Sequence, residues 1–290
     1  MKHSKKRMTD KELHNHTKSL FTCKDYLVSG ERYTLKKNKD FDMLVTSPIP
    51  SNLSKYYDSH EYVSHNNSKI TGLNILYNCI KKWSFKRKIA LFYKKSTQQA
   101  VLDIGAGTGD FLLYCKKNGM NVTGVEPNEN ARKKALMKGI LLQPSINTIP
   151  SHKFDVITLW HSLEHIPNLY ECINQLKNGL AKDGQMFVAV PNFKSFDANY
   201  YKEFWAAYDV PRHLWHFSQQ SIHLIFESVE MKVTKIHPLK FDSFYVSLLS
   251  EKHKTGTMNF MKAFLIGLRS NTKAIHTREF SSLIYQIEHK

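Results

Sequence analysis

Apolar and polar positions follow different patterns on the two sides of about residue 98. Beyond it, short apolar runs alternate with segments whose apolar residues recur at helical spacing. Such alternation predicts βαβ units and an α/β fold: a doubly wound, mostly parallel sheet with helices on both faces. The predicted strands are 99–104, 121–126, a weak one at 140–142, 154–160, 185–190, 230–237 and 281–290. The predicted helices are 109–118, 129–138, 169–180 and 219–228.

The first 97 residues lack this alternation. Residues 1–20 are polar, rich in His and Lys and aperiodic, which predicts a disordered basic tail. Residues 21–97 contain the strand-like runs YLVSGERYTL and FDMLVTS and then an amphipathic helix, which predicts a strand pair with a helical cap. Residues 98–290 form the main domain, with a helical hairpin inserted at about 241–269.

Positive charge is concentrated toward the beginning of the chain. The whole chain carries 42 Lys and Arg against 25 Asp and Glu, and its first 100 residues carry 20 against 8. A basic run with interleaved aromatic residues at 81–95 has three interpretations: a solvated helix face, a docking site for an anionic glycan or lipid-linked substrate, or a nucleic-acid contact. Because no RNA-binding module is recognisable, nucleic acid is the least favoured partner.

The cysteines and the apolar runs indicate the compartment. The four cysteines are far apart and include no Cys-x-x-Cys pair, which predicts reduced thiols, with neither disulfides nor a zinc site. No apolar run approaches the roughly 18 residues needed to cross a bilayer. The basic start is not followed by the apolar core of a signal peptide. We therefore expect a cytoplasmic protein that is not transmembrane.

The stretch VLDIGAGTGD carries the clearest chemical signal. It places Asp103 at the end of a predicted strand and a glycine at every second position after it. Ligands of open α/β sheets bind beyond the carboxyl ends of the strands, and glycine permits positive φ and close approach of the backbone to a ligand. The dinucleotide pattern G-x-G-x-x-G would need glycine at Asp110, and no G-x-x-x-x-G-K-[ST] loop is present. Glu126 ends the next strand, where a carboxylate can bind both hydroxyls of a ribose.

These residues resemble the first two motifs of the class I S-adenosylmethionine-dependent methyltransferases. FDVITLWHSLEHIPN is similar to the fourth-strand motif of that family, and LKNGLAKDGQMFVAVPN to the fifth. The segments GVEPNENAR, LEHI and DVPRHLWHFS resemble a bacterial subgroup, the ubiquinone-biosynthesis-like methyltransferases. The resemblance covers most of residues 40–290. Each motif alone is weak, but five in the right order are specific.

The resemblance implies a site for S-adenosyl-L-methionine. Its amino-acid end would lie over the glycine loop, its ribose on Glu126 and its adenine beside Pro127 and Asn128. Tyrosines of the N-terminal cap would face the sulfonium, although packing of the cap explains them equally well. The implied residues are Asp103, Gly105, Ala106, Gly107, Thr108, Gly109, Glu126, Pro127, Asn128, Trp160, His161, Leu163, Tyr57 and Tyr62. Relatives often carry an N-terminal zinc ribbon, but Cys23 is the only cysteine before residue 79, so no metal site is expected.

Candidate acceptor-side residues gather after the fifth strand. The segment 204–218 is rich in aromatic and charged residues, and it should cover the mouth of the cofactor site. Tyr208, Asp209, Arg212 and His213 would face the substrate or brace this lid; an aromatic plug with an internal Asp209–Arg212 pair is the alternative. His165 has the chemistry of a general base, or it caps the next turn.

Together these observations predict a seven-stranded methyltransferase sheet whose last strand is antiparallel. The expected reaction moves a methyl group from S-adenosylmethionine, most favourably to an oxygen of a small molecule or glycan. An RNA or protein methyltransferase is one alternative. A non-catalytic cofactor-binding protein that docks on a polyanion is another.

Overall fold

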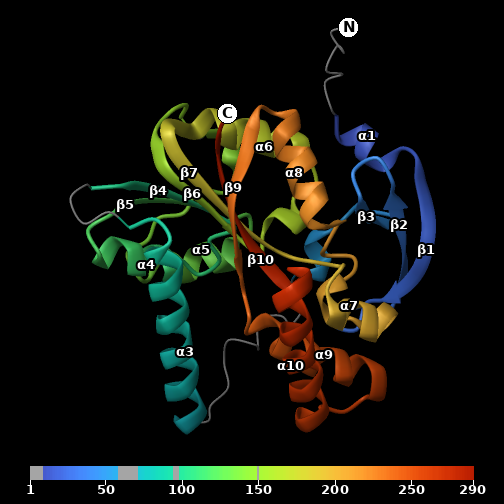
Figure 1. The fold of residues 1–290 in the computed structure, drawn as a ribbon. Coiled ribbons are helices and arrows are strands. Elements are labelled where there is room, and N and C mark those ends of the chain that lie inside the picture. Colours follow the sequence, from blue (N-terminus) through green and yellow to red (C-terminus); the bar gives the residue numbers. More distant parts are fainter. Residues whose placement is uncertain (1–8, 58–70, 94–97, 149) are drawn as a thin grey trace, which may run out of the picture.

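Two sheets organise the chain. The computed structural model describes residues 9–57, 71–93, 98–148 and 150–290 (Figure 1). Within them, the larger sheet has six strands in the order β5-β4-β6-β7-β10-β9, and the smaller has four in the order β1-β2-β3-β8. The larger sheet consists of β4 (Ala100–Ile104), β5 (Asn121–Val125), β6 (Phe154–Trp160), β7 (Leu180–Pro191), β9 (Met231–Pro238) and β10 (Ser282–His289).

The larger sheet has the predicted doubly wound arrangement. Strands β4, β5, β6 and β7 are parallel, and β10 is antiparallel to both β7 and β9. The weak strand expected at 140–142 is not among its strands. Instead, an isolated parallel bridge joins Val125 to Gln143. The predicted count of seven strands is therefore not confirmed.

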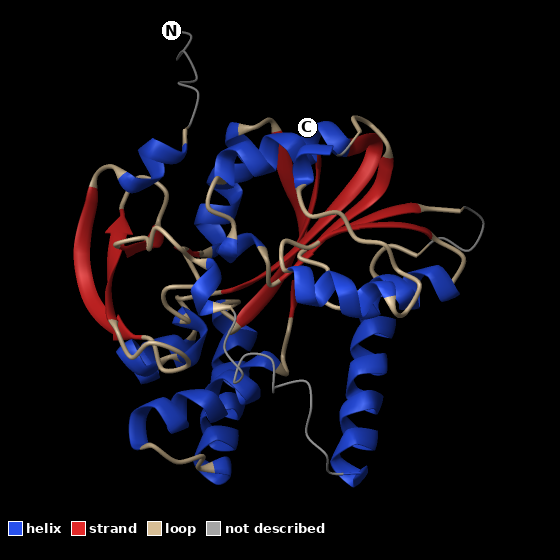
Figure 2. Ribbon diagram, turned by 180° about the vertical axis from the view of Figure 1, so that it is seen from behind, coloured by secondary structure: helices blue, strands red, loops and turns tan. Residues whose placement is uncertain are grey.

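Successive apolar side chains along a strand point to opposite faces of this sheet. On β4, Val101 packs with α3 and α4, whereas Leu102 packs with α6 and α8. Both side chains are fully buried, as expected for a sheet covered on its two faces. Figure 2 shows helices in front of and behind the strands. The helices of the two layers are α3 (Thr71–Ala90), α4 (Asp110–Lys117), α5 (Glu129–Leu136), α6 (Leu169–Gly179) and α8 (Gln219–Ser228).

The smaller sheet corrects the expectation of a disordered tail. The helix α1 (Asp10–His14) and the first half of the strand β1 (Thr17–Lys24) occupy residues predicted to be disordered. Leu13 is fully buried in the main core, and the Asn38 side-chain amide donates to its carbonyl oxygen at 3.0 Å. The other strands of this sheet are β2 (Arg32–Asn38), β3 (Met43–Ser47) and β8 (Trp215–His216).

Three further helices lie beside the smaller sheet and below the larger one in Figure 1. They are α7 (Phe196–Tyr201), α9 (Asp242–Thr255) and α10 (Phe260–Thr277). The last two lie between β9 and β10, so the inserted helical segment continues to Thr277 rather than ending near 269. No helix in the described parts of the chain combines the length and apolar character needed to cross a membrane.

The basic run at 81–95 belongs mainly to α3. Lys81 pairs with Asp110 at 2.7 Å, and the Lys88 ammonium lies 4.4 Å from the centre of the Trp160 ring. Arg87 stacks over Trp83. Several of these cations are therefore engaged within the protein, and docking of an anionic surface on this helix stays a prediction.

Candidate functional site

A cavity of about 1210 Å³ lies beyond the carboxyl ends of β4, β5 and β6. Loops that follow these three strands form one wall, and α9 contributes another. The segment 53–57, which includes a short 3-10 helix at Ser54–Tyr56, and parts of the segment 206–213 complete the lining. This is the place where open α/β sheets bind ligands.

The glycine loop after β4 is shaped by two backbone requirements. Gly105 has φ 72°, and a Cβ atom there would lie 2.6 Å from the Cβ of Ser162. Gly107 has φ 54°, but a Cβ atom there would meet nothing within 4 Å. Because Gly107 lines the cavity, a side chain at this position would occupy its space. The amide N–H groups of Gly105 and Ala106 both donate to the carbonyl oxygen of Val125, which joins the loop to β5.

The Glu126 carboxylate connects the ends of two neighbouring strands. One of its oxygens accepts from the backbone N–H of Gly107 and the other from that of Asn128, each at 2.8 Å. Asn128 in turn caps α5, because its side-chain oxygen accepts from the Ala131 N–H at 2.9 Å. Glu126, Pro127 and Asn128 all line the cavity, as do Gly105, Gly107 and Thr108.

Five residues of the implied cofactor set lie behind the cavity wall instead of lining it: Asp103, Ala106, Gly109, Trp160 and Leu163. The Asp103 carboxylate is buried and accepts a hydrogen bond from the Thr158 hydroxyl at 2.6 Å. Burial raises the pKa of Asp103. Trp160 packs edge-on against Phe111, and Leu163 is fully buried. These five residues lie behind the ones that line the cavity. Their direct contact with a cofactor stays a prediction.

In the loop after β6, a buried carboxylate faces histidines. Glu164 is 1% exposed, and its oxygen Oε1 lies 3.6 Å from Nδ1 of His161 and 4.0 Å from Nε2 of His213. Although burial opposes ionisation, these imidazoles hold the pKa of Glu164 at about 2. Burial also disfavours a charged His161, but Asp242 at 3.1 Å and Glu164 together raise the pKa of His161 to about 10. The cavity wall thus carries a charged carboxylate–imidazole pair.

His165 is a neutral member of the same cluster. Its Nδ1 lies 3.0 Å from both the Tyr57 hydroxyl and the carbonyl oxygen of Arg212. Burial and the neighbouring His213 lower the pKa of His165 to about 4, so its imidazole is uncharged near neutral pH. The ring of His213 stands edge-on at 4.6 Å, and both histidines line the cavity.

This cluster also has the geometry of a cation site. Glu164, His165 and His213 each offer one ligand atom, and the three atoms lie within 4.8 Å of one another. Imidazole nitrogens and a carboxylate oxygen are common ligands of divalent transition metals. No spacing pattern in the sequence indicates this cluster, because His213 is distant in the chain from the other two residues.

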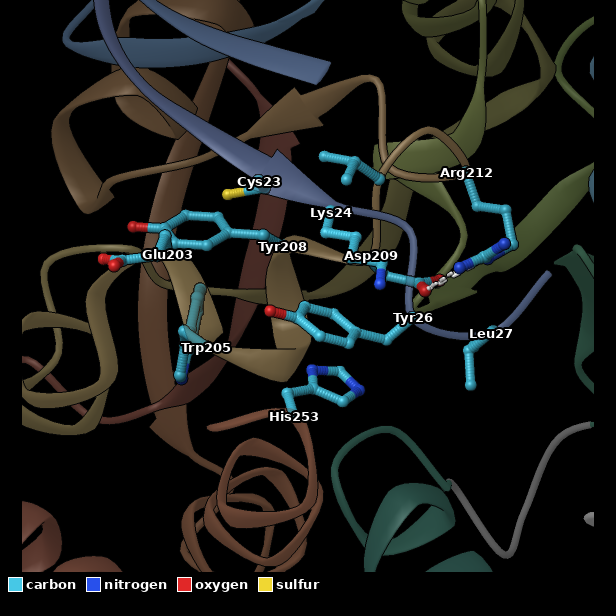
Figure 3. Close-up of a pocket in the computed structure, with 11 residues that line it drawn as sticks. Cys23, Lys24, Tyr26, Leu27, Glu203, Trp205, Tyr208, Asp209, Arg212 and His253 are labelled. Carbon is cyan, nitrogen blue, oxygen red and sulfur yellow. Dashed lines mark hydrogen bonds and ion pairs between the residues drawn. The ribbon is translucent and has the colours of Figure 1, made fainter. Parts of the chain in front are cut away.

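The predicted lid residues divide into two groups. Asp209 and His213 line the large cavity, whereas Tyr208 and Arg212 do not. Figure 3 shows Arg212 reaching toward Asp209; Nη2 of Arg212 lies 2.6 Å from Asp209 and 3.0 Å from Asp25. The internal Asp209–Arg212 pair is therefore present, and it is completed by an aspartate that the sequence did not indicate. That Tyr208 and Arg212 brace the lid stays a prediction.

The other lid elements come from both ends of the chain. Tyr57 lines the cavity, whereas Tyr62 lies outside the described residues. In Figure 3 the ring of Tyr26 lies against His253 of α9; the two rings are stacked with their centres 4.2 Å apart. Sequence reasoning missed the α9 residues that line the cavity, because the inserted helices carry no recognisable motif. These residues include Asp242, Tyr245, Val246, Leu249 and His253.

Comparison with known proteins identifies the family. A family model described as a methyltransferase domain matches residues 80–236, just over half of the chain. The chain belongs to this methyltransferase family. A solved methyltransferase has the same fold: the S-adenosylmethionine-dependent methyltransferase from Archaeoglobus fulgidus matches with a TM-score of 0.50 and 20% identity, over 73% of this chain and 93% of its own.

Curated relatives of this methyltransferase include proteins named ubiquinone biosynthesis O-methyltransferase. The one from Actinobacillus pleuropneumoniae serotype 7 (strain AP76) is 36% identical over 116 residues, which cover 35% of this chain and 47% of the relative. The one from Salmonella paratyphi A (strain ATCC 9150 / SARB42) is 30% identical over 117 residues, which cover 37% and 46%. The chain therefore spans about half the length of the curated relatives it matches.

Proposed function

We propose that this methyltransferase transfers the methyl group of S-adenosylmethionine to an oxygen atom of a small-molecule acceptor. The observation that carries the proposal is that Glu126 and the glycine loop line the same cavity as His165 and His213. Family membership and the names of the relatives support the reaction type. The large cavity offers room for a cofactor together with an acceptor.

The lining residues that follow β4 and β5 suit the cofactor. Both oxygens of Glu126 are oriented by backbone N–H groups, and each retains a lone pair for a ribose hydroxyl. The absence of a side chain at Gly107 leaves cavity space free beside that carboxylate. Pro127 and Asn128 extend the same wall and would flank the adenine. When bound, S-adenosylmethionine supplies a methyl carbon that its sulfonium makes electrophilic.

The part of the cavity lined by His165 and His213 suits proton transfer from an acceptor hydroxyl. If Nδ1 of His165 donates to the Arg212 carbonyl oxygen, Nε2 carries the lone pair that accepts the proton. The Glu164 carboxylate then stabilises the imidazolium that forms, because it favours the charged form of His165. A positioned base of this kind contributes typically about 10²–10⁴-fold to the rate. Alignment of the hydroxyl with the methyl group adds to it.

Apolar residues in the cavity lining favour a small acceptor with an apolar part. Leu27, Leu53, Val246 and Leu249 are among them, and they offer no hydrogen bonds to a sugar. A glycan would need such donors and acceptors. The glycan and macromolecular acceptors therefore rank below an apolar alcohol or phenol.

A second candidate role for the histidine cluster is to hold a divalent cation. The buried Glu164 carboxylate and the 4.8 Å span of the three ligand atoms favour it. The cation would lower the pKa of an acceptor hydroxyl directly, and His165 would then be a ligand instead of a base. Activity that is lost on chelation and restored by a divalent metal would select this role.

Isothermal titration with S-adenosylhomocysteine tests the cofactor site without knowledge of the acceptor. We expect wild-type protein to bind it and Glu126→Ala to bind at least about tenfold more weakly, which corresponds to about 1.4 kcal/mol. Glu129→Ala is the matched control, because Glu129 is an exposed carboxylate that pairs with Lys133. Absence of binding to the wild type, or equal weakening in both variants, contradicts the proposal. Methyl transfer to a panel of phenols and alcohols then separates an enzyme from a non-catalytic cofactor-binding protein.

A further inference from the structure

The inserted helix α10 presents its large apolar residues to solvent. Phe260, Met261, Phe264, Leu265 and Leu268 lie on one stripe of the helix, and Met258 precedes it. Phe260 and Met261 are 69% and 76% exposed. We call these six residues the α10 outer face. An apolar stripe of a globular helix normally faces the core, so this arrangement is inverted.

The inner side of the same helix consists of small residues together with Ile266, which packs in a core cluster. Gly267 lies so close to α9 that a Cβ atom there would meet the Phe244 side chain at 2.7 Å. Ala263, Ser270 and Ala274 are also buried against neighbouring elements. The hairpin is therefore held together by close backbone approach, and one ring of the outer face, Phe264, also stacks on Phe244 of α9 with the ring centres 5.4 Å apart. Contiguous exposed apolar surface of this kind marks an interaction site.

Charge indicates what covers the outer face. The sequence of α10 contains Lys262, Arg269 and Lys273 and neither Asp nor Glu. Arg269 and Lys273 are exposed and lie over the Phe196 ring, at 5.3 and 4.5 Å from its centre. Two copies of this face would bring like charges together, which disfavours self-association. An anionic partner with an apolar interior matches both features.

We propose that the α10 outer face docks on an anionic lipid bilayer. Its aromatic and aliphatic side chains enter the boundary between head groups and acyl chains, while Arg269 and Lys273 contact lipid phosphates, the arrangement typical of interfacial helices. Lys262 instead pairs with Glu251 of α9 at 3.2 Å. A nucleic acid would use the cations but not the aliphatic Met261, Leu265 and Leu268. The hairpin projects from one end of the molecule in both ribbon views (Figures 1 and 2), so the outer face can approach a flat surface.

Vesicle co-sedimentation of the full chain tests this docking. Vesicles of phosphatidylcholine alone are compared with vesicles that also contain phosphatidylglycerol. We expect wild-type protein to sediment with the anionic vesicles, and sedimentation to fall as salt is raised. The double variant Phe260→Ser with Met261→Ser should bind at least about tenfold more weakly, because each buried apolar side chain contributes that order of affinity.

The matched control removes equally exposed apolar side chains elsewhere. Met137 and Leu141 are 81% and 80% exposed, and neither lines the cavity; Met137→Ser with Leu141→Ser should sediment like the wild type. Unchanged thermal unfolding in both variants shows that they fold. Absence of sedimentation with anionic vesicles, or equal binding by both double variants, overturns the proposal. So does a lipid-free dimer in light scattering that disappears in Phe260→Ser with Met261→Ser, or RNA binding that the variant retains in place of vesicle binding.

Discussion

The backbone N–H of Gly107 donates to the carboxylate of Glu126 at 2.8 Å. This hydrogen bond connects the loop after β4 to the end of β5 and fixes a carboxylate at the cavity wall. The second oxygen of Glu126 is held by Asn128. The carboxylate is therefore oriented before any ligand enters, which lowers the entropic cost of binding.

Substitution of Gly107 should affect binding more than folding. Gly107→Val places a side chain in cavity space, and its positive φ costs about 1–2 kcal/mol. We expect affinity for S-adenosylhomocysteine to fall at least about tenfold. Gly119→Val is the control, since Gly119 also has positive φ and nothing within 4 Å of a Cβ atom but does not line the cavity. Equal affinities of the two variants in calorimetry would contradict this role of Gly107.

Removal of the proposed base should slow turnover and leave cofactor affinity unchanged. His165→Gln keeps a hydrogen-bonding side chain but cannot take up a proton, so kcat should fall by about 10²–10⁴-fold. His237→Gln, on β9 outside the cavity lining, should retain full activity. The two rates are compared at saturating acceptor, with the cofactor affinity of each variant measured separately. Retained turnover in His165→Gln would exclude His165 as the base.

Chelation distinguishes the base from a cation ligand. If His165 acts alone as the base, prolonged dialysis against a chelator leaves kcat unchanged. If Glu164, His165 and His213 hold a cation, the dialysed protein loses activity, and one added equivalent of a divalent metal restores it. Metal analysis of the protein before and after dialysis verifies the removal.

The buried Arg212 should be a strong determinant of stability. Arg212→Met leaves Asp25 and Asp209 without their shared cation in a buried place, and breaking such a pair typically costs about 3–5 kcal/mol. The exposed pair of Lys133 with Glu129 is the comparison; Lys133→Met should cost less than about 1 kcal/mol. Urea unfolding measures both changes. Equal free energies of unfolding for the two variants would show that the buried network contributes little.

Acid should weaken the same network. Burial alone would raise the pKa of Asp25, but the Ser29 backbone N–H and Arg212 lower it. Burial also opposes ionisation of the partly buried Asp209, but Arg212 lowers its pKa. Carboxyls with lowered folded-state pKa values stabilise the fold above their unfolded pKa, about 3.9. That stability is lost as pH falls from there through the folded values. Urea midpoints should drop steeply below about pH 4 in the wild type and less steeply in Arg212→Ala; parallel curves would contradict this assignment.

The sequence predicted the larger sheet because both of its faces are buried. A strongly apolar run such as 154–160 is typical of a strand in a sheet that is buried on both faces. The glycine loop indicates the edge of the sheet where a ligand binds. The hydrophobic pattern did not predict β1, because the residues of this strand are mostly exposed. This edge strand is held by backbone pairing with β2 and by contacts of α1, so its sequence needs no apolar alternation.

The site was predictable where its residues belong to recognisable motifs. Gly107 and Glu126 belong to consecutive motifs. Asp25 with Arg212, and His161 with Asp242, are pairs formed by distant segments that meet only after folding. No local pattern distinguishes these aspartates from solvated ones. The same reason explains why the α9 wall of the cavity was missed.

A crystal structure with S-adenosylhomocysteine would show directly where the cofactor binds. We expect both ribose hydroxyls within hydrogen-bond distance of the Glu126 carboxylate, the amino-acid end over Gly105 and Gly107, and the sulfur atom directed toward His165 and His213. Density for the ligand anywhere other than this cavity, or within it but without contact to Glu126, would contradict this cofactor site.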